Sequence, residues 1–174
     1  MTAKVYEIIT TVNDHPELMS VSIYFSGCDA NPKCEGCHNP QLWEPDAGRD
    51  IPYEQLKEIV VKKLEMLLLQ YEKVSLAYLG GEPLAIWHRE VVKRLSKDIK
   101  EVFGDRVVQI LYTWRTPYLI KRDFADYVQN IDEFVAGRFV QRLINKDKDG
   151  NVLFPASTNQ KYLTYAELFA EKKD

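Results

Sequence analysis

The chain has 174 residues, of which 45% are apolar and 28% charged, and its formal net charge is -3. These values are ordinary for one globular domain with its own core, and the small negative charge gives no electrostatic basis for nucleic-acid binding. No run approaches the ~20 apolar residues of a membrane span, and residues 1–7 lack the apolar core of a signal peptide. We therefore expect a cytoplasmic protein that contacts neither nucleic acid nor membrane.

Hydrophobic periodicity in the first half of the chain predicts strands alternating with a helix. Residues 5–12 and 18–25 are expected to form strands around a turn at 13–16, which contains Asn, Asp and Pro. A helix is expected to start at about 50–54, where proline and an acidic residue suit the first turn. Its apolar face would consist of Leu56, Ile59, Val60, Leu64, Leu67 and Leu68. Residues 73–79 read as a buried strand.

The second half continues the same alternation. Apolar residues at helical spacing over 91–103, followed by Gly104, predict a helix with a glycine cap. Strands are expected at 107–112 and 131–136, with a short helix at 117–128 between them. The polar stretch 145–151 is most simply a solvated turn, the alternative being a surface that docks a partner. The order of elements indicates an α/β protein with a mostly parallel sheet covered by helical crossovers.

All the cysteines of the chain, Cys28, Cys34 and Cys37, lie within ten residues. Thiolates are soft ligands that suit an iron-sulfur cluster or zinc. Structural zinc needs a fourth ligand, which would have to be one of the three histidines, His15, His38 and His88. His38 adjoins Cys37 and is awkwardly placed, and the other two are distant in sequence. An odd number of cysteines in a chain of this size also disfavours disulfides. A cluster with one open iron is favoured, with zinc or unrelated structural thiols as alternatives.

A second motif follows the predicted strand at 73–79. The strand runs into Gly80-Gly81-Glu82-Pro83-Leu84, and two glycines at a strand end let the backbone turn sharply and approach a ligand closely. Alone, this motif is more often a plain strand-to-helix turn. Its position one crossover after a loop with three cysteines makes it specific.

This combination resembles the radical S-adenosylmethionine (SAM) superfamily, in which three cysteines hold a 4Fe-4S cluster and SAM chelates the fourth iron. In that superfamily a Gly-Gly-Glu segment binds the methionine amino group. Further blocks are similar to the family of activating proteins of anaerobic (class III) ribonucleotide reductases. They are Phe25–Cys28, Cys34–Pro40 with Trp43, Leu111–Thr113, Gly137–Val140 and Ser157–Lys161. The similarity spans about 21–161.

The resemblance implies an incomplete (partial) β/α barrel of the radical SAM type, with the chemistry at the carboxyl ends of the strands. It implies a single domain over 1–174, a cluster loop at about 26–40 and a partner-facing segment at about 137–165. The superfamily usually has three residues between its first two cysteines, whereas this chain has five. We expect Asn31 and Pro32, both turn formers, to bulge outward without moving the thiolates.

The implied activity is reductive cleavage of SAM that generates a glycyl radical on the large subunit of the anaerobic reductase. A low-potential donor such as flavodoxin or ferredoxin would supply the electron. Metal ligands carried over from the family are Cys28, Cys34 and Cys37. Cofactor-binding residues carried over are Gly36, Cys37 and His38 along the adenine, and Gly80, Gly81 and Glu82 around the methionine. Glu82 has the alternative of capping the following helix, and His38 of being a plain surface residue.

Other polar residues have two readings each. Arg138 could meet the SAM carboxylate or an acid of the partner, or form an exposed salt bridge. Asn159 and Gln160 could serve the partner interface or satisfy backbone groups near the C-terminus. Trp43, Tyr112 and Trp114 are expected to pack in the core or at the rim.

Two other functional readings remain. The chain could activate a different glycyl-radical enzyme or act on a small molecule, as deazaguanine synthases do. It could also be a non-enzymatic zinc or iron-sulfur binding module, which would leave Gly80–Pro83 unexplained.

Overall fold

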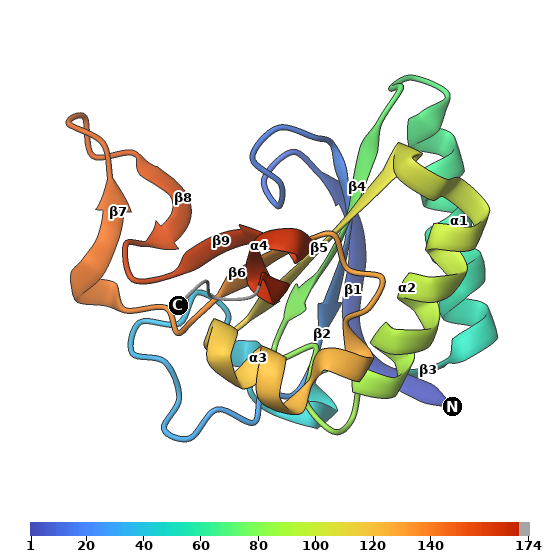
Figure 1. Ribbon diagram of the computed structural model, residues 1–174. Coiled ribbons are helices and arrows are strands. Elements are labelled where there is room, and N and C mark those ends of the chain that lie inside the picture. The colour runs from blue at the N-terminus through green and yellow to red at the C-terminus, as the bar shows by residue number, and fades with distance from the viewer. Residues whose placement is uncertain (171–174) are drawn as a thin grey trace.

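The computed structural model describes residues 1–170, and within them seven strands form one open, mixed sheet of order β3-β1-β2-β4-β5-β6-β9 (Figure 1). These strands are β1 (Thr2–Thr11), β2 (Ser20–Phe25), β3 (Arg49–Pro52), β4 (Val74–Gly80), β5 (Val107–Thr113), β6 (Glu133–Ala136) and β9 (Lys161–Thr164). Two further strands, β7 (Ile144–Lys146) and β8 (Val152–Ser157), pair in a separate antiparallel hairpin. The α/β prediction is confirmed. The sheet does not close into a barrel in this part of the chain.

Four neighbouring strands, β2, β4, β5 and β6, run parallel. The flanking strands β1, β3 and β9 are antiparallel to their neighbours, so the sheet is more mixed than predicted. Carboxyl ends of parallel strands meet at one edge of a sheet, where ligands of open α/β folds bind. The loops that follow these four strands therefore come together at a single edge.

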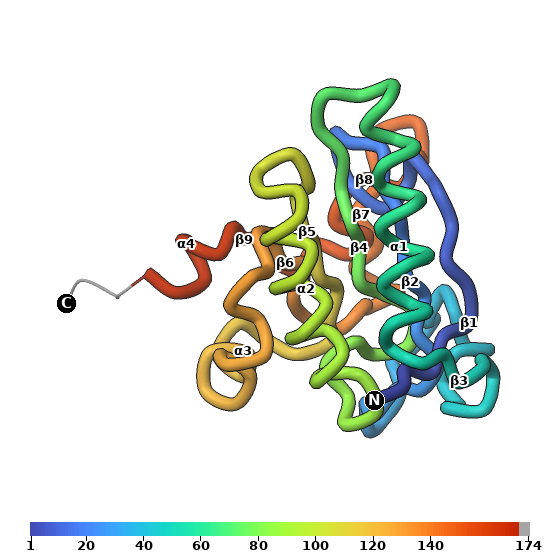
Figure 2. Tube along the Cα trace, turned by 90° about the vertical axis from the view of Figure 1, so that its right-hand side faces the viewer, coloured from blue at the N-terminus to red at the C-terminus, as the bar shows by residue number. Residues whose placement is uncertain are grey.

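Two long helices, α1 (Tyr53–Leu68) and α2 (Arg89–Phe103), cover one face of the sheet and stand in front of the strands in Figure 2. Their apolar faces include Leu56, Val60, Leu64, Val92, Leu95 and Ile99, none of which is exposed. Full burial of such a side chain contributes roughly 1.5–3 kcal/mol. Gly104 ends α2 with a φ of 56°, as the sequence predicts. Helices α3 (Pro117–Asp123) and α4 (Tyr165–Phe169) are short. No helix among the described residues is long and apolar enough to cross a membrane.

The helix expected to start at about 50–54 begins at Tyr53, after Pro52 and with Glu54 in its first turn, so this prediction is confirmed. Residues 49–52 before it pair as β3 with the N-terminal part of β1, a strand that was not predicted. One predicted helix boundary is wrong. The helix expected over 117–128 ends at Asp123, because Phe124 has a φ of -127°, outside the helical range. Short 3-10 turns lie at Pro40–Leu42, Pro45–Ala47, Gly104–Arg106, Ala125–Tyr127 and Gln141–Leu143.

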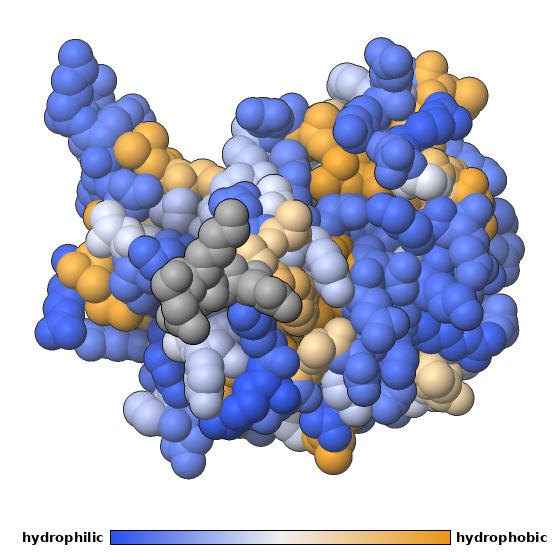
Figure 3. Space-filling model, viewed as in Figure 1, coloured by the Kyte–Doolittle hydropathy of each residue, from blue (hydrophilic) through white to orange (hydrophobic). Residues whose placement is uncertain are grey.

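The second face of the sheet is partly covered by the hairpin of β7 and β8, which projects from the body of the protein (Figure 3). Phe154 of β8 packs edge-on against Tyr112 and Tyr162, at centroid distances of 6.5 and 5.0 Å. Residues 147–151 at the hairpin tip are mostly exposed, in keeping with the predicted solvated turn.

The loop between β1 and β2 is fastened to the same side. The Tyr24 hydroxyl donates to the Asp14 carboxylate at 2.7 Å, and the Tyr112 hydroxyl donates to the Asp14 carbonyl at 2.7 Å. The Nδ1 atom of His15 accepts two backbone N–H groups, so its Nε2 carries the proton and donates to Glu133 at 3.0 Å. This loop and the hairpin leave a hollow between them.

The buried hydroxyl of Tyr78 offers a test of the helical face. It donates to Gln109 Oε1 at 2.5 Å, while the amide nitrogen of Gln109 donates to the carbonyls of Ser96 and Asn130. Tyr78→Phe leaves a buried acceptor without its donor, so we expect the free energy of unfolding to fall by about 1–3 kcal/mol in urea titrations. Tyr71→Phe, at a residue 42% exposed, is the control and should change it little. Equal effects would contradict this account.

Candidate metal and cofactor site

A cavity of about 530 Å³ lies at the edge where the parallel strands end. Its wall is built by the loops after β2, β4, β5 and β6 together with the β7–β8 hairpin. Of the predicted site residues, the wall includes Cys28, Cys34, Cys37, His38, Gly80, Gly81 and Glu82. Pockets for small molecules typically measure roughly 300–1,000 Å³. The cavity therefore has room for a cofactor and brings both sequence motifs together.

The three thiols are free and partly buried around this cavity. Burial raises the pKa of Cys28 to about 11, so the thiol is protonated near neutral pH and would release its proton on binding a metal. No three His, Cys, Asp or Glu side chains among residues 1–170 are grouped to hold a single metal ion. In a cubane cluster each thiolate binds its own iron, so its ligands do not converge on one point. Three thiols along one cavity wall can each bind one iron of such a cluster.

The two motifs are hydrogen-bonded to each other through their backbones. Gly81 N–H donates to the Phe25 carbonyl, and Glu82 N–H donates to the Gly27 carbonyl, each at 2.8 Å. A Cβ atom on Gly81 would lie 2.2 Å from the Gly27 oxygen, a distance that no side chain tolerates. We expected these glycines to make room for a ligand. The structure shows that Gly81 first makes room for the cysteine loop.

Glu82 is 1% exposed, and protein donors surround its carboxylate. Oε1 accepts the Thr113 hydroxyl at 2.9 Å and the Leu84 N–H at 3.0 Å, and lies 3.1 Å from the Arg115 guanidinium. Oε2 accepts the Trp114 N–H at 3.1 Å. The bond to Leu84 caps the turn after β4. This role is close to the predicted alternative, in which Glu82 caps the following helix. Contact of Glu82 with the methionine amino group stays a prediction.

Arg115, which the sequence analysis did not single out, joins the two motifs. It is 5% exposed and its Nη2 lies 2.5 Å from Asp29 Oδ2, beside Cys28, while Nη1 reaches Glu82. Burial tends to raise the pKa of Asp29, but hydrogen bonds from Arg115 and Trp114 outweigh it and hold that pKa below its ordinary value. The only sequence signal was a basic residue three positions after the strand predicted at 107–112.

The histidines have separate surroundings. His38 is exposed at the cavity wall, with its ring 4.4 Å from that of Phe139. His88 is fully buried, and its Nδ1 donates to the Glu82 carbonyl at 2.8 Å. Burial lowers the pKa of His88, so the ring stays neutral. His15 is bonded to Glu133, away from the cysteines. None of the three is grouped with the thiols around one ion in the described part of the chain.

The remaining predicted residues lie around the cluster loop. Gly36 is exposed beside Gln141 and is not part of the cavity wall. Arg138 donates to the Pro32 carbonyl at 2.5 Å, and it pairs with no carboxylate of residues 1–170. Asn159 donates to the Arg138 carbonyl at 2.8 Å, and Gln160 donates to the Gly137 carbonyl at 3.2 Å. Asn159 and Gln160 thus satisfy backbone groups, the second of their two readings.

The fold and the cavity together define an α/β protein with three cysteines at the carboxyl edge of its sheet. A family model described as the 4Fe-4S single cluster domain matches residues 18–163, most of the chain. The chain therefore belongs to the 4Fe-4S single cluster domain family. No curated protein sequence matches it. The predicted 4Fe-4S cluster is supported at this level.

Gly81→Ala should separate the two motifs. The added methyl group would collide with the Gly27 carbonyl, which belongs to rigid backbone, so the cysteine loop must move. We expect a free energy of unfolding lower by more than about 2 kcal/mol and loss of most iron uptake on anaerobic reconstitution. Gly104→Ala meets nothing within 4 Å, so its cost of about 1–3 kcal/mol should come from the φ of 56° alone and leave iron uptake full. Normal iron uptake by Gly81→Ala would contradict the proposed contact.

Glu82 should make stability depend on pH. Burial raises its pKa from 4.5 to about 7, although Arg115 and the surrounding donors oppose this. The folded state therefore holds this proton more tightly than the unfolded state, and the resulting stabilisation is full below pH 4.5 and lost as the pH rises through 7. Relative to Glu82→Gln, the wild-type free energy of unfolding should fall by roughly 3 kcal/mol between pH 4.5 and 8. Parallel urea-unfolding profiles for the two proteins would show that Glu82 does not titrate in this range.

Proposed function

We propose that this protein is a radical SAM activating enzyme that generates a glycyl radical on the large subunit of an anaerobic ribonucleotide reductase. The observation that carries the proposal is the shared cavity. Three cysteines from the loop after β2 and the Gly80–Glu82 segment after β4 line it together. Membership of a 4Fe-4S family supports the cluster, and the sequence blocks that resemble reductase activating proteins supply the partner.

Cys28, Cys34 and Cys37 are the proposed ligands of the 4Fe-4S cluster. Three ligands leave one of four irons for SAM, and their loop lies at the open side of the sheet. The bound cofactors supply one-electron chemistry, namely reductive cleavage of a SAM carbon-sulfur bond and the hydrogen abstraction that leaves a glycyl radical. The protein contributes binding, orientation and exclusion of water.

The surrounding residues have distinct proposed tasks. Gly80 and Gly81 present backbone atoms to the methionine part of SAM, and Cys37 and His38 lie along the adenine, where Phe139 supports the His38 ring. Glu82 keeps the Gly-Gly turn in place through its own hydrogen bonds and faces the amino group. Gly36 lies outside the wall, so its task is to shape the turn before Cys37.

The open sheet also suits a protein substrate. We propose that the parallel strands represent an incomplete β/α barrel of the radical SAM type, within one domain over 1–174. Its open side leaves room for a glycine-bearing loop of the reductase. The segment 137–165 would face this partner, because Val152 and Leu153 in its hairpin line the cavity and are 56% and 45% exposed. A low-potential flavodoxin or ferredoxin would donate the electron in the cytoplasm.

The decisive experiment is anaerobic reconstitution with iron and sulfide, followed by EPR spectroscopy of the dithionite-reduced protein with and without SAM. We expect a cluster signal that shifts when SAM is added, formation of 5′-deoxyadenosine, and a glycyl-radical signal when the reductase large subunit is present. Cys34→Ala should abolish all three. Met66→Ala is the matched control, since it removes a sulfur atom from the exposed surface of α1, and should abolish none.

The other outcomes separate the alternatives. A colourless protein with one zinc, or a cluster indifferent to SAM, would favour a non-enzymatic binding module. Deoxyadenosine without a glycyl radical on the reductase would favour an activase of another glycyl-radical enzyme, or a small-molecule enzyme of the deazaguanine synthase kind.

A further inference from the structure

The five residues between Cys28 and Cys34 are held at both ends by side chains from other loops. At the first end, Asp29 accepts the Trp114 indole N–H at 2.9 Å and lies 2.5 Å from the Arg115 guanidinium. At the second end, the Pro32 carbonyl accepts Arg138 Nη1 at 2.5 Å. The holding groups come from the loops after β5 and β6, which flank the cysteine loop at the sheet edge.

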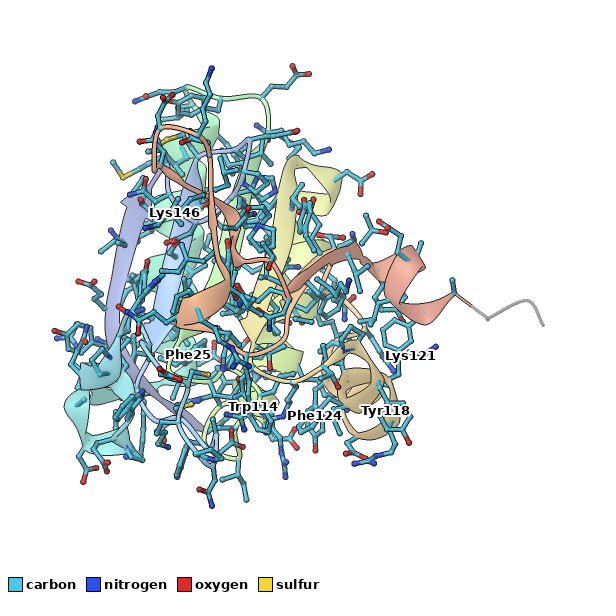
Figure 4. All side chains as sticks on the ribbon, turned by 90° about the vertical axis from the view of Figure 1, so that its left-hand side faces the viewer. Phe25, Trp114, Tyr118, Lys121, Phe124 and Lys146 are labelled. Carbon is cyan, nitrogen blue, oxygen red and sulfur yellow. The ribbon has the colours of Figure 1, made fainter. Side chains whose placement is uncertain are left out.

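These holding side chains also contact one another. The guanidinium carbons of Arg115 and Arg138 lie 4.8 and 4.7 Å from the Trp114 ring centre. Arg115 additionally lies 4.4 Å from the ring centre of Phe124, and Figure 4 shows Trp114 and Phe124 close together at the end of the sheet. Cation-π contacts of this kind strengthen as water is excluded, and Arg115 is 5% exposed.

The insert itself is only partly an outward bulge. Asn31 and Pro32 are exposed as expected, but Ala30 is 2% exposed and packs inward. Lys33 turns back and donates to the Cys28 carbonyl. A longer loop has more conformations to lose when it becomes ordered, so its ordering requires additional contacts.

We infer that Trp114, Arg115 and Arg138 form a clasp that holds Cys28 and Cys34 at the cavity wall despite the long spacing between them. The three are positioning residues that act on the cluster loop through Asp29 and Pro32. The inference rests on the proposed function only in taking these cysteines as cluster ligands. In this role Arg138 holds the cluster loop, which differs from the earlier predictions that it binds a SAM carboxylate or an acid of the partner.

The first test uses the metal-free, reduced protein. Short pulses of iodoacetamide, read for each cysteine by mass spectrometry, report how often the loop opens. Arg138→Ala should raise the alkylation rates of Cys28 and Cys34 about two- to fivefold relative to Cys37, the fold-change that corresponds to one cation-π contact. Arg138→Lys, which keeps the charge and reach, should restore part of the protection. Arg138 is not part of the core, so these variants should fold.

The matched control is Arg94→Ala. Arg94 lies 4.1 Å from the Tyr53 ring centre and 3.0 Å from Glu54, so its loss removes the same kinds of contact at a place remote from the cluster loop. The alkylation rates should then stay at their wild-type values. A rise at all three thiols in both arginine variants, or no rise in Arg138→Ala, would overturn the clasp.

A double-mutant cycle tests the route through Asp29. Trp114→Phe keeps an aromatic ring but loses the indole N–H, so it should expose Cys28 in the wild-type background and add nothing to Asp29→Ala. Additive effects would overturn that route. Iron content after reconstitution gives a second readout, which should fall in the clasp variants but not in Arg94→Ala.

These experiments distinguish a failure of the clasp from a failure of the proposed function. Clasp variants with exposed thiols and low iron content would support the clasp even if the wild-type protein left SAM intact, in which case only the function falls. Conversely, loss of SAM cleavage in Arg138→Ala with unchanged alkylation and iron content would overturn the clasp and place Arg138 at the cofactor.

Discussion

The backbone contact between the Gly27 carbonyl and the Glu82 N–H, 2.8 Å long, is the constraint on which the site depends. It continues the parallel pairing of β2 and β4 past the ends of both strands, so the cysteine loop and the Gly-Gly-Glu turn leave the sheet in contact. The contact is possible only because Gly81 has no side chain, since any Cβ there would meet the Gly27 oxygen. A protein that positions two motifs this closely can present both to one small molecule. Because the two motifs are so close, a larger side chain at Gly81 would displace the cysteine loop.

Charge is buried directly behind that contact. Glu82 and Arg115 are 1% and 5% exposed, and Asp29 completes a chain of alternating charges that ends beside Cys28. Removing one member of such a network costs much more than the network contributes as a whole, because the remaining charges stay buried without partners. Its value to the protein lies in specificity, since these groups satisfy one another in a single arrangement of the loops after β2, β4 and β5. The carboxylate of Glu82 is accordingly held by donors from the segments after β4 and β5.

Local sequence patterns predicted the two long helices and the four parallel strands. Helical spacing located α1 and α2, Gly104 marked the end of α2, and buried apolar runs located β2, β4, β5 and β6. The patterns missed β3 and β9, because each depends on an antiparallel partner far away in the sequence, and they also missed the hairpin strands β7 and β8. The cavity could be anticipated from the cysteines and Gly80–Glu82, since parallel strand ends meet at one edge. Arg115 could not, because its importance comes from Asp29 and Glu82, which lie far from it in the chain. Spacing alone also predicted a simple bulge at Asn31 and Pro32. The structure shows that side chains from the loops after β5 and β6 hold both ends of the insert.

The cluster loop follows β2, but the groups that hold it follow β5 and β6, so its order depends on pairing across the whole parallel part of the sheet. Helices α1 and α2 supply the apolar burial that stabilises this pairing from the opposite face, without touching the cavity. The main apolar burial and the cavity therefore lie in different places, on the helical face and at the carboxyl edge of the sheet. The helical face determines whether the strands assemble, and the assembled edge determines whether the thiols are within reach of one cluster. The position of the cysteine loop therefore depends on contacts that exist only when β6 is paired with β5 in the sheet, because Arg138 follows β6 and bonds to the Pro32 carbonyl.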